Sequence, residues 1–134
     1  MANLLQAVTQ YGPRVELKPT AQLEKVAEWV SMRTGLNKSE VMMVLQEMSE
    51  AVLYFTKDGV PVKLPGVGTF TPGVDGEGTY NIGFRADMDL KNGINTPNAF
   101  QGEVKNSERI GWTHQQYKDL WDSEHPEDPL EIPD

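Results

Sequence analysis

Residues 60–73 read VPVKLPGVGTFTPG. Apolar residues at every second position up to Leu64 predict a half-buried strand. Pro65 and Gly66 then favour a tight turn, and Gly68 allows the backbone to bend or to approach another group closely. A second strand begins at residues 69–70, so this stretch predicts the corner of an antiparallel hairpin.

Two helices are predicted upstream of this corner. Apolar residues recur at helical spacing over residues 21–34, with Thr20 as a candidate N-cap and Gly35 as the stop. Asn37, followed by Glu40 three positions later, is typical of a capping box and opens a second apolar helical stripe. Because the two stripes can face each other across a short turn, the pattern predicts a helix hairpin.

Downstream of the corner, alternation at residues 80–84 predicts a third strand. Residues 87–92 predict a short closing helix, which we expect Gly93 to stop. Residues 73–78 are so rich in glycine that we expect no side chain to order them. The pattern as a whole predicts an α+β fold, in which a two-helix hairpin precedes a three-stranded antiparallel sheet and a short closing helix.

The two ends of the chain differ from this middle part. Residues 15–17 alternate like a short edge strand, and residues 96–111 show no clear period. A further capping-box pattern predicts one short helix over residues 113–124. The chain is therefore expected to divide into an N-terminal extension (1–19), a main domain (20–95) and an acidic C-terminal extension (96–134).

Composition and charge exclude several classes of function. The 134 residues include no cysteine, so disulfide and thiolate chemistry are excluded. The formal net charge of −8 is unfavourable for a protein that holds nucleic acid by its phosphates, although residues 96–134 carry most of the excess. No stretch is as long as a membrane span, and residues 1–15 lack the features of a signal peptide, so we expect a soluble, cytoplasmic protein.

The segments TGLNKSEV (34–41), KLPGVGTF (63–70) and FRADMDLKNGIN (84–95) together resemble the HU and integration host factor superfamily of bacterial DNA-binding proteins. The resemblance covers residues 20–95, and the residues before Thr20 resemble the N-terminal extension of HU-related proteins from gut-type bacteria. It implies an HU-like subunit that forms a homodimer, whose two sheets build a saddle for double-stranded DNA at the bacterial nucleoid.

The long DNA-bending arm of this superfamily is missing from the sequence. In the superfamily, a basic β-arm leaves the sheet after the second strand, and its tip carries a proline wedge flanked by arginines. Here thirteen residues separate Phe70 from Phe84, and Asp75 and Glu77 are their only charged members. We therefore expect no kinking of DNA and only weak binding that is independent of base sequence.

The resemblance also implies a set of candidate DNA-binding residues at the corner and beside it. Main-chain N–H groups of the glycines would approach phosphates, and the basic side chains would add salt-dependent contacts. An ordinary tight turn with solvated surface charges is the alternative interpretation of the same residues. The candidates are Lys63, Gly66, Gly68, Arg85 and Lys91.

Aromatic and apolar residues near the predicted tail helix allow two interpretations. They either dock on the protein's own body or on the dimer mate, or they form an epitope for another protein. Docking on the protein itself is the expected arrangement, because apolar faces of helices are more often covered than free. These candidate partner-binding residues are Trp112, Tyr117, Leu120 and Trp121.

We predict no catalytic, cofactor or metal site. His114 and His125 are the only histidines, and their spacing matches no metal motif. Two functions remain. The first is a weak, backbone-contacting architectural DNA-binding protein, and the second is an HU scaffold reused as a structural or protein-interaction module. The turn and the helix pattern favour the first, whereas the missing arm and the acidity favour the second.

Overall fold

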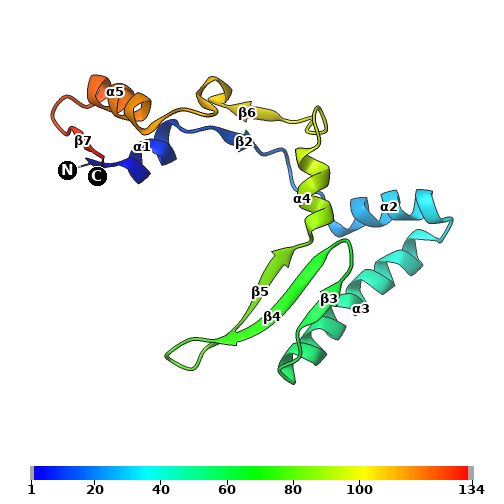
Figure 1. Cartoon of the computed structure of the whole chain (residues 1–134). Coiled ribbons are helices and arrows are strands. Elements are labelled where there is room, and N and C mark those ends of the chain that lie inside the picture. Colours follow the sequence, from blue (N-terminus) through cyan, green and yellow to red (C-terminus); the bar gives the residue numbers. More distant parts are fainter. Residues whose placement is uncertain (1, 133–134) are drawn as a thin grey trace. The chain divides into compact units, whose positions relative to one another are not determined.

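The computed structural model describes residues 2–132, which form two compact units (Figure 1). We call residues 19–100 the central unit. Residues 2–18 together with 101–132 form the other, which we call the terminal unit. The N-terminal and C-terminal extensions, which the sequence presents as separate pieces, are thus parts of one folded body.

The central unit contains the predicted helix hairpin, sheet and closing helix. Its sheet is antiparallel, with strand order β3-β4-β5, and it lies beside α3 (Figure 1). The predicted α+β fold class is therefore confirmed. The elements are α2 (Leu23–Thr34), α3 (Lys38–Lys57), β3 (Val62–Leu64), β4 (Gly68–Val74), β5 (Tyr80–Ala86) and α4 (Met88–Asn95).

Local capping explains where the helices begin and end. The Asn37 side chain accepts a hydrogen bond from the Glu40 backbone N–H at 3.2 Å, so the predicted cap of α3 is confirmed. The predicted cap of α2 is wrong, because that helix begins two residues later than expected, after Gln22 instead of Thr20. The predicted stop at Gly93 is also wrong. One glycine costs a helix only about 1 kcal/mol, and α4 continues past it to Asn95.

The turn between β4 and β5 is more ordered than the glycine content suggested. The Asp75 carboxylate accepts hydrogen bonds from the backbone N–H groups of Thr79 at 3.0 Å and Glu77 at 2.8 Å. These bonds lower the pKa of Asp75 because they favour its charged form, and the bond from Thr79 has the largest effect. The expectation that no side chain orders residues 73–78 is therefore wrong, since one carboxylate closes the turn.

The terminal unit is built from short elements at both ends of the chain. Strand β1 pairs in parallel with β7, and β2 pairs antiparallel with β6. The extended segment expected near residue 15 is present as β2, whereas α1 and β6 were not predicted. The elements are β1 (Ala2–Asn3), α1 (Leu4–Tyr11), β2 (Arg14–Glu16), β6 (Glu103–Lys105), η1 (Ser107–Arg109), α5 (His114–Glu124) and β7 (Leu130–Glu131).

The core of the terminal unit joins these distant segments. Ala7 on α1 is fully buried, as is Leu130 on β7, and they pack with Tyr117 and Trp121 from α5. The Trp121 indole N–H donates to the Asp128 carbonyl oxygen at 2.7 Å, which satisfies the polar atom of a buried ring. The predicted tail helix is therefore present, and its apolar face packs against α1.

One ion pair holds the last strand against α5. The Lys118 ammonium donates to the Asp122 carboxylate at 2.7 Å and to the Leu130 carbonyl oxygen at 3.0 Å. The hydrogen bond from Lys118 lowers the pKa of Asp122 most, and a second bond from the Leu130 backbone N–H lowers it further.

None of the helices within residues 2–132 is long and apolar enough to cross a membrane.

Candidate nucleic-acid interface

The two faces of the three-stranded sheet differ in chemistry. Lys63 pairs with Thr69, which pairs with Arg85 on the other side, so these three residues form one row across the sheet. Paired residues point to the same face, and two strand spacings place the Lys63 and Arg85 backbones about 10 Å apart. The two candidate cations that sequence analysis singled out here are therefore brought together.

No acidic residue occurs in β3, β4 or β5. Lys63 and Arg85 are both exposed, and Thr69 between them is half-buried. We call the surface formed by Lys63, Thr69, Thr71 and Arg85 the polar sheet face. In a chain of net charge −8, this face carries two positive charges and no negative charge of its own, which suits it to a row of phosphates.

The opposite face of the same sheet is apolar. Phe70 and Phe84 pair directly, and their ring centroids lie 4.8 Å apart. Phe84 nevertheless remains 52% exposed, and the neighbouring Ile82 remains 45% exposed. This face is therefore incompletely covered by the chain's own helices.

A type II turn connects β3 to β4. The Val67 N–H donates to the Leu64 carbonyl oxygen at 3.0 Å, and Gly66 has a φ of +82°, which an L-residue adopts only with strain. A side chain at Gly66 would contact nothing within 4 Å, so the surface of the turn is open at that position. Such an opening allows a ligand to approach the backbone closely.

Gly68 serves a different purpose. A Cβ at this position would lie 2.5 Å from the Arg85 carbonyl oxygen and 2.6 Å from the Phe84 ring. Gly68 is also buried. Close packing of β4 against β5 and the Phe84 ring therefore accounts for this glycine without a phosphate.

Replacing Gly68 with alanine is expected to lower the free energy of unfolding by about 1–3 kcal/mol, because the added methyl group must displace backbone. Gly76→Ala is the matched control, since a Cβ there meets nothing within 4 Å. The control should leave stability unchanged or raise it by up to about 1 kcal/mol. Denaturant unfolding followed by circular dichroism measures both, and equal stabilities would contradict the tight packing at Gly68.

Lys91 lies apart from the polar sheet face. It is exposed on α4, where it lines a shallow pocket of about 520 Å³ together with Asp89 and Ile94. The nearby Asp89 offsets part of its charge. The structure therefore groups Lys63 and Arg85 on one surface and leaves Lys91 on a separate element.

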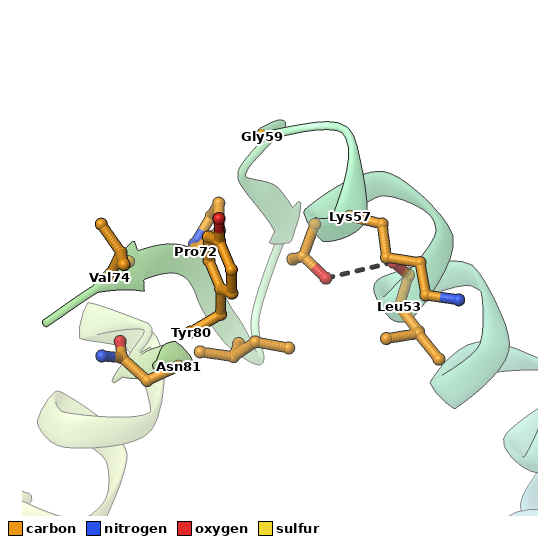
Figure 2. Close-up of a pocket in the computed structure, with 10 residues that line it drawn as sticks. Leu53, Lys57, Gly59, Pro72, Val74, Tyr80 and Asn81 are labelled. Atoms are coloured by element: carbon orange, nitrogen blue, oxygen red, sulfur yellow. Dashed lines mark hydrogen bonds between the residues drawn. The ribbon is translucent and has the colours of Figure 1, made fainter. Parts of the chain in front are cut away.

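A pocket of about 800 Å³ lies between the end of α3 and the β4–β5 hairpin. Figure 2 shows Leu53 and Lys57 on the helix side, with Pro72, Val74 and Tyr80 on the hairpin side. The pocket is lined mainly by apolar groups and opens on the apolar sheet face. This side of the sheet therefore has an apolar hollow next to the exposed Phe84.

A second uncovered surface runs along α3. Val44, Met48, Ala51 and Phe55 follow one another at spacings of four, three and four residues, so they share one side of the helix. Val44 is 59% exposed and Phe55 is 45% exposed. We call these four residues the α3 seam. Val44, Met48 and Phe55 belong to the apolar helical stripe that is expected to face the first helix, but all three remain exposed.

The aromatic residues proposed as a partner epitope lie largely inside the terminal unit. Tyr117 and Trp121 are only 5% and 6% exposed. Trp112 and Leu120 are half-buried, and the Trp112 ring lies 5.4 Å from that of Tyr117. This is the arrangement in which the tail docks on the protein's own chain, so little of the aromatic cluster is available to another protein.

The histidines have no grouping suited to metal binding. The His125 ring stacks on Trp121 with a centroid distance of 4.0 Å, as part of the packing around α5. Within residues 2–132, no three His, Asp or Glu side chains are placed to hold a metal ion. The prediction that the protein has no catalytic site stays a prediction.

Two comparisons with known proteins give a match. The model of the HU-HIG family, described as an HU domain fused to wHTH, Ig, or glycine-rich motif, matches residues 5–92. An HU protein from Anabaena, solved as a cocrystal with DNA, aligns with 17% sequence identity and a TM-score of 0.49. That alignment covers 57% of this chain and 100% of the Anabaena chain. No curated protein matches the chain.

Proposed function

Because the chain belongs to the HU-HIG family, whose members carry an HU domain, we propose that it binds double-stranded DNA through the polar sheet face. The observation that carries the proposal is the row of Lys63, Thr69 and Arg85, which gathers two cations on strands that contain no acidic residue. The open turn at Gly66 offers backbone at the end of the same sheet. These groups are suited to phosphates, which position a protein on DNA without specifying sequence.

The binding we propose is weak and architectural. The β4–β5 hairpin closes in a turn held by Asp75, and no Lys or Arg occurs between Phe70 and Phe84. The hairpin therefore has no cationic tip that could follow the minor groove and no wedge that could open a base step. Affinity should come from a few phosphate contacts and should fall steeply with salt.

We further propose that the DNA-binding form is a homodimer. The α3 seam and the apolar sheet face are both exposed in the single chain, and burial of such surface is the main driving force for association. Few side chains of the central unit are buried, namely Ala27, Val41 and Thr56. A second copy would complete this small core and double the number of cations that face DNA. A role of this kind belongs at a bacterial nucleoid and involves no catalysis.

The second candidate function is an HU scaffold reused for protein interaction. The charge of the terminal unit favours it, because that unit carries nine acidic and five basic residues. A net charge of this sign repels DNA and so opposes the first proposal. Measuring DNA binding separates the two candidates.

Reversing the charge of Arg85 with Arg85→Glu is expected to weaken binding to a short duplex by about tenfold or more, since a contact is replaced by repulsion. Lys63→Glu should act in the same way, and either change should reduce the slope of log affinity against log salt by about 1 per lost contact. Lys38→Glu is the matched control, because Lys38 lies in the first turn of α3, where a carboxylate is favourable. Fluorescence anisotropy at low and moderate salt measures all three.

A chain of residues 19–100 tests the contribution of the acidic terminal unit. It should bind the same duplex more tightly than the full chain, because the repelling charge is removed. Ending the chain at Asn95 is a poorer design, since α1 would remain without α5 against which it packs. If neither the full chain nor residues 19–100 binds duplex at low salt, the DNA-binding proposal is wrong.

A further inference from the structure

The side of α2 that faces away from the hairpin carries an unusual set of exposed residues. Trp29 is 57% exposed and Met32 is 73% exposed. Lys25, Trp29, Met32 and Arg33 are spaced so that they share one side of the helix. Ala27, two positions from both Lys25 and Trp29, is fully buried on the opposite side against α3. We call the four residues the outer α2 face.

The outer α2 face is basic as well as apolar. The Arg33 guanidinium lies 5.0 Å from the centroid of the Trp29 ring, which holds the cation and the aromatic ring together as one surface. Of the two acidic residues of the helix, Glu24 lies off this side, whereas Glu28, three positions after Lys25 and four before Met32, borders it. With Lys25, Arg33 and one bordering carboxylate, this face has a net positive charge in a chain with twenty acidic residues.

The outer side of α3 provides an internal comparison. Tyr54 is 72% exposed and Met43 is 59% exposed, so this side also has exposed apolar residues. Their neighbours on that side, Glu47 and Glu50, are acidic. The two helices of the hairpin therefore present similar apolar groups with opposite charge, and only α2 is complementary to an acidic ligand.

From this charge complementarity we propose that the outer α2 face is a docking site for an acidic amphipathic segment of another protein. Trp29 supplies a large aromatic anchor, and Met32 is a flexible apolar group that adapts to a partner. Lys25 and Arg33 lie on either side of the anchor, where they pair with carboxylates and exclude basic segments. The site is separate from both the polar sheet face and the α3 seam, so it is independent of DNA binding.

The test uses the full chain and a labelled helical peptide of about sixteen residues that combines a leucine stripe with glutamates. A second peptide with lysine in place of each glutamate is the charge control. Wild-type protein should bind the acidic peptide and not the basic one, measured by fluorescence anisotropy. Trp29→Ala should weaken binding roughly 30-fold, as expected for an aromatic hot spot, and the double variant Lys25→Glu, Arg33→Glu at least about tenfold. Tyr54→Ala, which removes a still more exposed aromatic residue on α3, should change it less than about twofold.

Three results would overturn the proposal. The first is no binding of the acidic peptide, or equal binding of the basic one. The second is a loss with Tyr54→Ala as large as that with Trp29→Ala. The third is evidence that something else occupies the face. If light scattering shows that Trp29→Ala changes the oligomeric state, the face binds a second copy of the chain. If duplex DNA displaces the peptide, the face binds nucleic acid.

Discussion

Replacing Trp121 with alanine is expected to unfold the terminal unit while the central unit remains folded. Truncating a buried Trp typically costs about 3–5 kcal/mol. Trp121 is 6% exposed, stacks on His125, meets the Tyr11 ring edge-on at 6.0 Å and donates to the Asp128 carbonyl oxygen. A unit this small has only a few kcal/mol to lose, so the change should exceed its stability.

Two-dimensional amide spectra can follow the two units separately in one sample. In Trp121→Ala, signals from residues 2–18 and 101–132 should collapse toward unfolded positions, and those of the sheet should stay dispersed. Trp29→Ala is the control, since its side chain is more than half exposed and its loss should change stability by less than about 0.5 kcal/mol. Loss of dispersion throughout Trp121→Ala would show that the units do not fold independently.

Introducing a charge into the α3 seam with Met48→Glu is expected to dissociate the homodimer that we propose. If Val44, Met48 and Phe55 meet a second copy, the change buries two carboxylates without partners, one from each subunit. The dissociation constant should rise by more than about 100-fold, which corresponds to about 3 kcal/mol. The dissociated chain should also be less stable, because the seam and the apolar sheet face would both meet water.

Light scattering over a range of micromolar concentrations measures this effect. Met43→Glu introduces the same group at an exposed position outside the seam and should leave the dimer intact. A monomer with wild-type sequence, or a dimer that tolerates Met48→Glu, would contradict the shared core that we propose for the central unit.

The parts of the fold that could be predicted are those in which neighbouring residues determine the structure. The α3 cap depends on the Asn37 side chain, and the β3–β4 corner on Pro65 and Gly66, so both are visible in a short window of sequence. The same holds for the row of Lys63 and Arg85, because strand alternation and a tight turn fix which residues share a face. Exact helix ends were missed where no side chain caps them, as at Gln22.

The parts that could not be predicted depend on residues far apart in the sequence. Strand β6 pairs with β2, and this contact leaves no local pattern in the sequence. Helix α1 packs against α5, and its only local signal is the capping box of Asn3 and Gln6 at its start, which the sequence predictions did not use. Strands β1 and β7 contain two residues each, too few for any periodicity. Gly68 shows a different limit of sequence-based prediction. A glycine that lets a phosphate approach the backbone cannot be distinguished in the sequence from one that makes room for a neighbouring strand.

The parallel pairing of β1 with β7 also fixes the order in which the protein matures during its synthesis. Ala2 pairs with Leu130, so the terminal unit cannot close until almost all of the residues described here have left the ribosome. Helix α1, made first, must wait unpaired, while residues 19–100 between the two halves can already fold. Nascent chains are exposed to proteases and aggregation while they remain incomplete. A folded terminal unit therefore marks a chain whose central unit has already been synthesised.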